Sequence, residues 1–216
     1  ARRGKRDDSA LIRAVVFDMY ETLITLFNTP VYWGGQMAMD ADVDAAAFQR
    51  LWDATELPRT LGKLTLEEAL RSVLAQLHCD SKEVLNLLVQ KRVAAKEACF
   101  AHMHEEILPL LDRLRARGMR VGLISNCFSE EACAIRGSVL FPYFDAVCLS
   151  CEQGVQKPDP AIFQICVEKL GVRPDECLYV GDGGSRELEA ARALGMQTAQ
   201  AAWYLKEGAP QPTGRL

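Results

Sequence analysis

The second half of the chain alternates between short apolar runs and longer amphipathic segments. Four apolar runs predict buried strands, over residues 119–125, 144–150, 177–182 and 196–201. Four segments with apolar side chains at helical spacing predict helices, over residues 104–117, 130–140, 160–170 and 185–194. Strands that alternate with helices in this way predict a doubly wound parallel α/β sheet, to which residues 11–18 add one strand.

Residues 28–102 break this alternation. Their pattern predicts three amphipathic helices without a strand between them, over residues 40–56, 64–77 and 81–98. Thr65 and Glu68 have the spacing of a capping box at the start of the second helix. Residues 30–40 contain the pair Gly34-Gly35 and are expected to form a flexible loop at the entrance of this insert.

These patterns predict three parts of the chain. A Rossmann-like catalytic core is expected over residues 11–27 and 103–216, with an all-helical cap inserted over residues 28–102. Residues 1–10 are expected to be a loose N-terminal arm, because their basic residues are followed by Asp7 and Asp8 and by no long apolar run of the kind found in a signal peptide.

Composition and charge narrow the classes of function. The net charge is −4 and the isoelectric point is near 5.5, so we expect no nucleic acid and no anionic membrane as a partner. The cysteines at 99, 148, 166 and 177 lie in apolar, periodic surroundings, which is typical of free core thiols in a reducing cytosol. We therefore expect a cytoplasmic protein. Its oligomeric state cannot be read from the sequence.

Polar residues of four kinds follow the predicted strands. They are the carboxylate of Asp18, the Ser125-Asn126 pair, the ammonium group of Lys157 and the carboxylate of Asp182. In open α/β sheets, ligands bind beyond the carboxyl ends of the strands, so the fold should gather these residues at one edge. A nucleophile, hydrogen-bond donors, a cation and a metal ligand are the groups that phosphoryl transfer needs.

In this order and spacing, the motifs resemble those of the haloacid dehalogenase (HAD) superfamily of hydrolases, in its dehalogenase-like branch with a helical C1-type cap. The matching residues are Asp18 and Thr22 in the first motif, Ser125 and Asn126 in the second, Lys157 in the third, and Asp182 and Glu187 in the fourth. The resemblance covers the whole chain, because the helical insert lies where that branch has its cap.

The resemblance implies a role for each motif. Asp18 would attack phosphorus and form an aspartyl phosphate, while Lys157 would neutralise charge on Asp18 and the phosphate. The hydroxyl of Ser125 and main-chain amides near residues 19–20 and 126 would hold the phosphoryl oxygens. Mg²⁺ would be bound by the residues of the first and fourth motifs: Asp18, the main-chain carbonyl of Tyr20, Asp182 and Glu187.

Tyr20 departs from the family pattern. Phosphatases of the family usually have a second Asp there, which protonates the leaving alcohol, whereas a phenol with an ordinary pKa near 10 is poorly matched to that task. Tyrosine at this position resembles the 2-haloacid dehalogenases, which expel halide and use no metal. The acids Asp182 and Glu187 beside Asp18 favour a metal instead, since three close carboxylates repel each other without a cation.

We therefore predict an enzyme, a Mg²⁺-dependent phosphatase of a small phosphorylated metabolite. Two alternatives stay open because of Tyr20: a 2-haloacid dehalogenase-type hydrolase, and a catalytically weak member of the family that binds a ligand or partner. The sequence does not identify the substrate, the group that replaces the usual acid at position 20, or whether Glu187 binds metal directly. It also leaves the roles of Arg50, Arg59 and Cys127 open.

Overall fold

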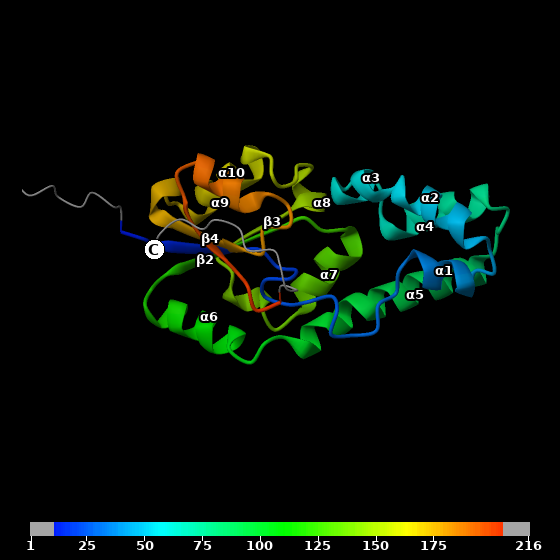
Figure 1. Cartoon of the computed structure of the whole chain (residues 1–216), viewed down its shortest axis with the longest axis horizontal. Helices are drawn as coiled ribbons and strands as arrows, with labels where there is room; N and C mark the ends of the chain where they lie inside the picture. Colours follow the sequence, from blue (N-terminus) through cyan, green and yellow to red (C-terminus); the bar gives the residue numbers. More distant parts are fainter. Residues whose placement is uncertain (1–10, 205–216) are drawn as a thin grey trace, which may run out of the picture.

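A five-stranded parallel sheet organises the larger part of the molecule (Figure 1). The structure, a computed structural model, describes residues 11–204, so the predicted N-terminal arm over residues 1–10 lies outside the described residues. The strands are β1 (Ala14–Phe17), β2 (Arg120–Ser125), β3 (Ala146–Leu149), β4 (Cys177–Gly181) and β5 (Gln197–Gln200). Their order is β3-β2-β1-β4-β5, and every pairing is parallel, which confirms the predicted fold class.

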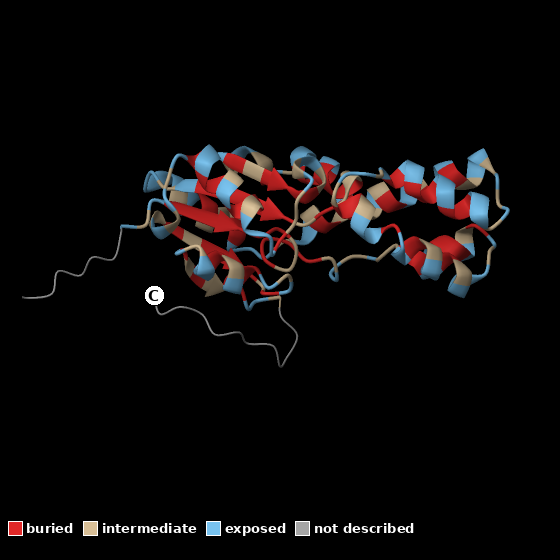
Figure 2. Cartoon of the chain, turned by 90° about the horizontal axis from the view of Figure 1, so that it is seen from above, coloured by how far each residue is buried: buried red, intermediate tan, exposed pale blue. Residues whose placement is uncertain are grey.

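Helices cover both faces of the sheet, as the doubly wound fold requires (Figure 1). One face carries α6 (Ile107–Ala116) and α7 (Ser129–Gly137), and the other carries α9 (Pro160–Leu170) and α10 (Glu187–Ala193). The short α8 (Ser150–Gln153) follows β3 directly. All four residues of β1 are buried, because β1 is central in the sheet and has apolar layers on both sides (Figure 2).

Five helices follow β1 and form a separate lobe with its own apolar core, which we call the helical lobe (residues 34–98; Figure 1). They are α1 (Gly34–Asp40), α2 (Ala45–Asp53), α3 (Glu56–Thr60), α4 (Leu66–Gln76) and α5 (Lys82–Ala98). The capping box of α4 is confirmed: Thr65 Oγ1 accepts from the amide of Glu68, and the amide of Thr65 donates to Glu68 Oε2 at 2.8 Å.

Two local predictions in this lobe are wrong. The expected loop over residues 30–40 contains helix α1, which begins at the glycine pair. Gly34 is packed closely, since a Cβ there would lie 2.0 Å from the Gln49 side chain. The single helix predicted over residues 40–56 is divided, and a short α3 follows α2. Asp44 sets the start of α2 by accepting a hydrogen bond from the amide of Ala47 at 2.7 Å.

The long helix α5 joins the helical lobe to the core and packs along α7 (Figure 1). Leu66 at the start of α4 also donates its amide to Ser129 Oγ, at the start of α7, at 3.1 Å. The helical lobe therefore rests on the loop and helix that follow β2. Among residues 11–204, none of the helices has the combined length and hydrophobicity needed to span a membrane.

Candidate active site

The sheet order places the predicted site residues at one edge. β1 lies between β2 and β4, so Asp18 after β1, Ser125 at the end of β2 and Asp182 after β4 come from three adjacent strands. Lys157 comes from the loop between α8 and α9, and Glu187 begins α10. The sequence therefore placed these residues at the correct edge of the sheet.

Asp18 and Lys157 form a buried ion pair. Lys157 Nζ lies 2.7 Å from Asp18 Oδ1, and their exposed fractions are 2% and 7%. Lys157 also donates to the hydroxyl of Tyr179 at 3.3 Å, which fixes the direction of the ammonium group. Burial raises the pKa of Asp18, although the positive charge of Lys157 opposes that rise. The Asp18 carboxylate is thus held by one cation on one of its oxygens.

Asp182 and Glu187 complete an acidic cluster with Asp18. One carboxylate oxygen from each of the three residues lies within 4.8 Å of the others. Burial, with smaller contributions from Asp18 and Glu187, raises the pKa of Asp182 to about 6. We call Asp18, Asp182, Glu187 and Lys157 the acidic centre; it contains three acids and one base.

The loop after β4 is shaped around Glu187. The amides of Gly183 and Ser185 donate to its two carboxylate oxygens at 2.8 and 2.7 Å. Burial acts to raise the pKa of Glu187, but Lys157 and these amides lower it overall. Gly181 has to be glycine here, since a Cβ would lie 2.8 Å from Glu187 Oε1. With both oxygens engaged by amides, Glu187 orders the loop that presents Asp182.

Two hydroxyl groups of the predicted motifs, one at the end of β2 and one four residues after Asp18, have unused hydrogen-bonding capacity. Ser125 Oγ and Thr22 Oγ1 are buried and have no hydrogen-bond partner among the described residues. Burying a hydroxyl without a hydrogen-bond partner costs free energy, and a polar ligand that bonds to it would recover that cost. The Asn126 side chain is already used: it donates to the carbonyl of Lys157 at 3.0 Å and accepts from the amide of Lys157 at 2.8 Å. It therefore positions the lysine.

The Tyr20 phenol points into the contact between the core and the helical lobe. Its hydroxyl is buried and has no hydrogen-bond partner among residues 11–204, and Lys96 of α5 lies 5.9 Å from its ring centre. Burial raises the pKa of Tyr20 well above its ordinary value, and the nearby Glu131 adds to that rise. A phenol in these surroundings stays protonated at neutral pH and is a weak acid.

The two arginines that the sequence could not distinguish differ in the structure. Arg50 is exposed on α2, whereas Arg59 on α3 is 2% exposed and lies between two aromatic rings. Cys127 is buried with its Sγ 3.9 Å from that of Cys151. All eight cysteines are free thiols in the structure.

Sequence reasoning missed four buried charged residues around Tyr20. They are Arg92 and Lys96 on α5, and Glu130 and Glu131 on α7. Lys96 Nζ lies 2.5 Å from Glu131 Oε1, and Arg92 Nε lies 3.1 Å from Glu130 Oε1. The available signal was spacing: Arg92 and Lys96 continue the buried face of α5 that starts at Leu88.

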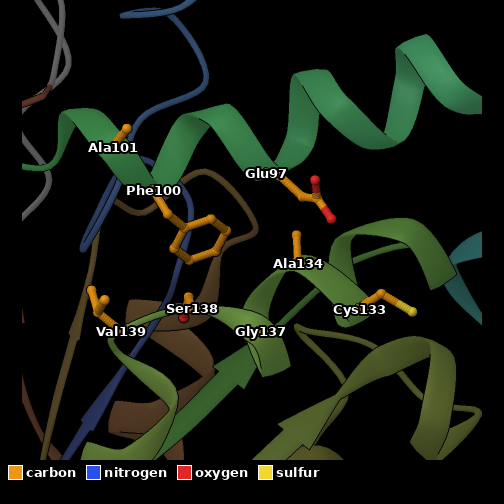
Figure 3. Close-up of a pocket in the computed structure, with 8 residues that line it drawn as sticks. All are labelled: Glu97, Phe100, Ala101, Cys133, Ala134, Gly137, Ser138 and Val139. Atoms are coloured by element: carbon orange, nitrogen blue, oxygen red, sulfur yellow. The ribbon is translucent and has the colours of Figure 1, made fainter.

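A separate groove lies away from the predicted site residues. It has a volume of about 360 Å³ and lies between the end of α5 and α7 (Figure 3). Glu97, Phe100, Cys133 and Val139 are among the residues that line it, and it includes none of the predicted site residues. The acidic centre, with its charged and unpartnered groups, is the candidate active site.

Comparison with known proteins agrees with this arrangement. The family model of the haloacid dehalogenase-like hydrolases matches residues 12–195. The chain belongs to this family. The match includes β1, the helical lobe and the fourth motif, so it covers both the acidic centre and the helices above it.

Relatives within the HAD family include both phosphatases and dehalogenases. The glyceraldehyde 3-phosphate phosphatase of Methanopyrus kandleri is 27% identical over 88% of this chain and 84% of its own length. The (S)-2-haloacid dehalogenase 4A of Burkholderia cepacia is 28% identical over 88% of this chain and 82% of its own. The mouse acyl-CoA dehydrogenase family member 10 is 30% identical, but the chain spans only 17% of that protein's length.

Solved HAD structures share the fold. A HAD family enzyme from Bacteroides thetaiotaomicron, crystallised with magnesium and inorganic phosphate, superposes with a TM-score of 0.66 at 20% identity. The similarity covers 88% of this chain and 96% of that one. A crystallised dehalogenase gives a TM-score of 0.58 at 25% identity. The fold is thus that of the HAD family.

Proposed function

We propose that this HAD hydrolase is a Mg²⁺-dependent phosphatase of small phosphorylated molecules. The observation that carries the proposal is the acidic cluster: Asp18, Asp182 and Glu187 present oxygens within 4.8 Å of one another, with Lys157 paired to Asp18. A hard dication prefers carboxylate oxygens, so the donor set fits Mg²⁺. Asp18, the main-chain carbonyl of Tyr20 and Asp182 would hold it, and Glu187 would do so directly or through water.

In the proposed reaction, the free oxygen of Asp18 attacks phosphorus. The bond between phosphorus and the ester oxygen breaks, and its electron pair stays on the leaving oxygen, which takes a proton from solvent to become the alcohol. Water then attacks the phosphorus of the aspartyl phosphate, which restores the Asp18 carboxylate and releases inorganic phosphate. When bound, Mg²⁺ supplies positive charge that offsets the repulsion between the anionic nucleophile and the anionic substrate.

The chain's other residues hold and neutralise the phosphoryl group in this proposal. The ammonium group of Lys157 is paired with Asp18 and also donates a hydrogen bond to the Tyr179 hydroxyl, which fixes its direction. The Ser125 hydroxyl has no hydrogen-bond partner among the described residues and can donate to a phosphoryl oxygen. The leaving alcohol receives no proton from Tyr20, because the buried phenol has a raised pKa and neighbours Glu131. We therefore expect rates to depend strongly on the acidity of the leaving group.

An aryl phosphate tests the proposal directly. The protein with Mg²⁺ should hydrolyse p-nitrophenyl phosphate, whose leaving group needs no proton, and should hydrolyse ethyl phosphate much more slowly. A chelator should abolish the activity, and added Mg²⁺ should restore it. Failure to hydrolyse any member of a broad panel of aryl and alkyl phosphates would contradict the proposal.

Dehalogenation is the second candidate, and Tyr20 together with the dehalogenase relative favours it. Asp18 would then attack the halogen-bearing carbon of a 2-haloacid and expel halide, which needs no proton. Halide release from 2-chloropropionate in the presence of chelator would support this function. The acidic centre argues against it, because three close carboxylates are costly in a reaction that uses no cation.

A further inference from the structure

Two cysteine side chains lie in contact next to the segment that follows β2. Cys127 Sγ lies 3.9 Å from Sγ of Cys151, which is the second residue of α8. The two residues are 24 positions apart in the sequence, and both are free thiols in the structure. None of the roles proposed above for the acidic centre uses either thiol.

The two thiols differ in their access to solvent and in their readiness to ionise. Cys127 is 1% exposed, whereas Cys151 is half-buried. The hydrogen bond from Cys127 lowers the pKa of the Cys151 thiol, against the opposing effects of burial and of the neighbouring Glu152. Arg136 donates to both carboxylate oxygens of Glu152, at 2.9 and 2.6 Å, and so offsets that negative charge. Cys151 is therefore the member of the pair that a small oxidant from solvent reaches as a thiolate.

The main chain of Cys127 is tied to the residue next to Cys151. Its amide donates to Ser150 Oγ at 2.9 Å, and the same hydroxyl donates to its carbonyl at 3.2 Å. Ser150 is fully buried and begins α8, so the fold itself holds the two sulfur atoms as neighbours. A bond between them requires an approach of about 2 Å, from contact distance to the ordinary length of a disulfide.

The other cysteines do not combine a neighbouring thiol with access from solvent. Cys148 and Cys166 are hydrogen-bonded to each other, but both are fully buried. Cys133 is exposed on α7, and it is the only cysteine among the described residues that line its groove (Figure 3). Among the eight cysteines, which all lie within residues 11–204, Cys127 and Cys151 are thus the pair best placed for oxidation.

The segment that carries Cys127 also carries two residues of the candidate active site. Ser125 precedes Cys127 by two residues, and its buried hydroxyl has no hydrogen-bond partner among the described residues. Asn126 precedes Cys127 directly and bonds to both the amide and the carbonyl of Lys157. A displacement of Cys127 toward α8 would therefore reach, within one or two residues, the groups proposed to hold the phosphoryl group.

The helical lobe packs on α8 at the same place. Gly62 lies two residues after α3 and has a φ of +70°. A Cβ on Gly62 would lie 1.8 Å from the carbonyl oxygen of Cys151, so the main chains of the lobe and of α8 are in close contact there. Cys151 thus lies where the segment after β2, α8 and the helical lobe come together.

We propose that Cys127 and Cys151 form a site of reversible oxidation, where a hydroperoxide such as hydrogen peroxide converts the two thiols into a disulfide that lowers hydrolysis at the acidic centre. The Cys151 thiolate attacks one peroxide oxygen and breaks the O–O bond, which gives a sulfenic acid and hydroxide. The hydroxide takes up the proton that the thiol had lost and becomes water. The Cys127 sulfur then attacks the sulfenic sulfur, the S–O bond breaks, and the hydroxyl group leaves with the Cys127 proton as a second water.

Two thiols are oxidised in this sequence, and one peroxide is reduced to two waters. A thiol reductant reverses the change by thiol–disulfide exchange. The formation of the disulfide is independent of the proposed phosphatase function, whereas its effect on hydrolysis rests on that function.

Peptide mapping tests the oxidation site. The reduced protein is treated with hydrogen peroxide, its remaining thiols are blocked with an alkylating reagent, and the digest is analysed by mass spectrometry. We expect a pair of peptides joined through Cys127 and Cys151, with the mass of two hydrogen atoms lost. Cys148 and Cys166 should stay thiols, because solvent does not reach them. If Cys127 and Cys151 are recovered as thiols, or if Cys151 oxidises without forming the link, the proposal is overturned.

Activity measurements test the consequence of the disulfide. Oxidation should lower kcat/KM for p-nitrophenyl phosphate with Mg²⁺ by at least about tenfold, since a misplacement of about 1 Å can cost about 100-fold, and dithiothreitol should restore it. Cys151→Ser and Cys151→Ala should keep their hydrolysis and lose the sensitivity to peroxide. Cys133→Ser, which removes an exposed thiol, is the matched control and should stay sensitive. Equal sensitivity of the Cys151 variants and the wild type would overturn the proposal.

The two measurements also separate this proposal from the proposed function. If the reduced and the linked protein hydrolyse p-nitrophenyl phosphate equally, the proposed function stands and the regulatory disulfide fails. If the protein hydrolyses no phosphate but the link forms, the proposed function fails while the oxidation site stands. Calorimetry with inorganic phosphate and Mg²⁺ then measures the effect on the site: the disulfide should weaken phosphate binding, and unchanged binding would overturn its regulatory role.

Discussion

The acidic centre differs in charge from a second cavity, which lies between the helical lobe and the core. Arg59, Arg92 and Lys96 are among the residues that line this cavity, and we call it the lobe–core cavity. The first gathers three carboxylates around one lysine, and the second gathers three cations around two buried carboxylates. Each has a surplus of one sign in a place where water cannot fully compensate it. A buried surplus is destabilising by itself. At the acidic centre, this cost supports the proposed Mg²⁺, whose charge would offset the surplus of carboxylates.

The two regions also differ in how they are built. The acidic centre is assembled from strand ends and loops of the core, whose positions the sheet fixes. The lobe–core cavity depends on how the helical lobe packs on the core at α7, so its walls come from both parts of the molecule. We propose that the helical lobe is the cap, which admits substrate to the acidic centre.

Replacing the proposed nucleophile should give the largest effect. Asp18→Asn removes the attacking oxygen and should lower kcat on p-nitrophenyl phosphate by on the order of 10⁴-fold or more. Steady-state hydrolysis measures it, and Asp112→Asn, an exposed acid on α6, is the control. If the Asp18→Asn protein kept its turnover, the acidic centre would not be the active site, and its contrast with the lobe–core cavity would have no functional meaning.

Removing a carboxylate from the cation-rich side should cost stability. Glu130→Gln leaves Arg92 and Arg59 without their shared partner, so we expect the free energy of unfolding to fall by about 3–5 kcal/mol. Denaturant unfolding measures the change. Glu67→Gln breaks the exposed pair with Arg71 and should cost less than about 1 kcal/mol. A similar small loss for both variants would mean that the charges around the cavity are effectively solvated.

The sequence predicted the acidic centre far better than the lobe–core cavity, and the reason is topological. Parallel strands bring their carboxyl ends to one edge of the sheet whatever the side-chain packing, so the sequence alone groups Asp18, Ser125 and Asp182. The five strands followed from the same alternation of apolar runs. The path of the main chain decides both the strand positions and the grouping of the site residues.

The lobe–core cavity depends instead on side-chain burial that periodicity does not reveal. Arg50 and Arg59 look alike in sequence, and only the division between α2 and α3 turns one outward and the other between two rings. Glu130 and Glu131 resemble ordinary first-turn helix acids until α5 covers them. Contacts between distant helices set these positions.

Neutralising one acid should stabilise the metal-free protein by about 1 kcal/mol. Asp182→Asn removes one of three mutually repelling carboxylates. Folding raises the pKa of Asp182 from 3.8 to about 6, so its unfavourable contribution grows as the pH rises through that interval and is complete above it. The gain should therefore be larger at pH 8 than at pH 4 in thermal unfolding with chelator.

With Mg²⁺ present, the wild type should become more stable than the Asp182→Asn protein. At 100 times its Kd, the ion should stabilise the wild type by about 2.7 kcal/mol and the Asp182→Asn protein much less. Gly181 and the Glu187 loop are unchanged in this variant, so a lost response to Mg²⁺ reports on the ligand itself. Equal stabilisation of both proteins by Mg²⁺ would place the cation elsewhere.

Tyr20, which stands between the two regions, should give the smallest effect on stability. Tyr20→Phe deletes a buried hydroxyl that has no hydrogen-bond partner among the described residues, so the free energy of unfolding should stay the same or rise by about 0.5–1 kcal/mol. Tyr179→Phe is the matched control, because its hydroxyl accepts from Lys157 at 3.3 Å and its loss should be destabilising. If Tyr20→Phe instead lost more than about 1 kcal/mol, the Tyr20 hydroxyl would have a hydrogen-bond partner in the folded protein.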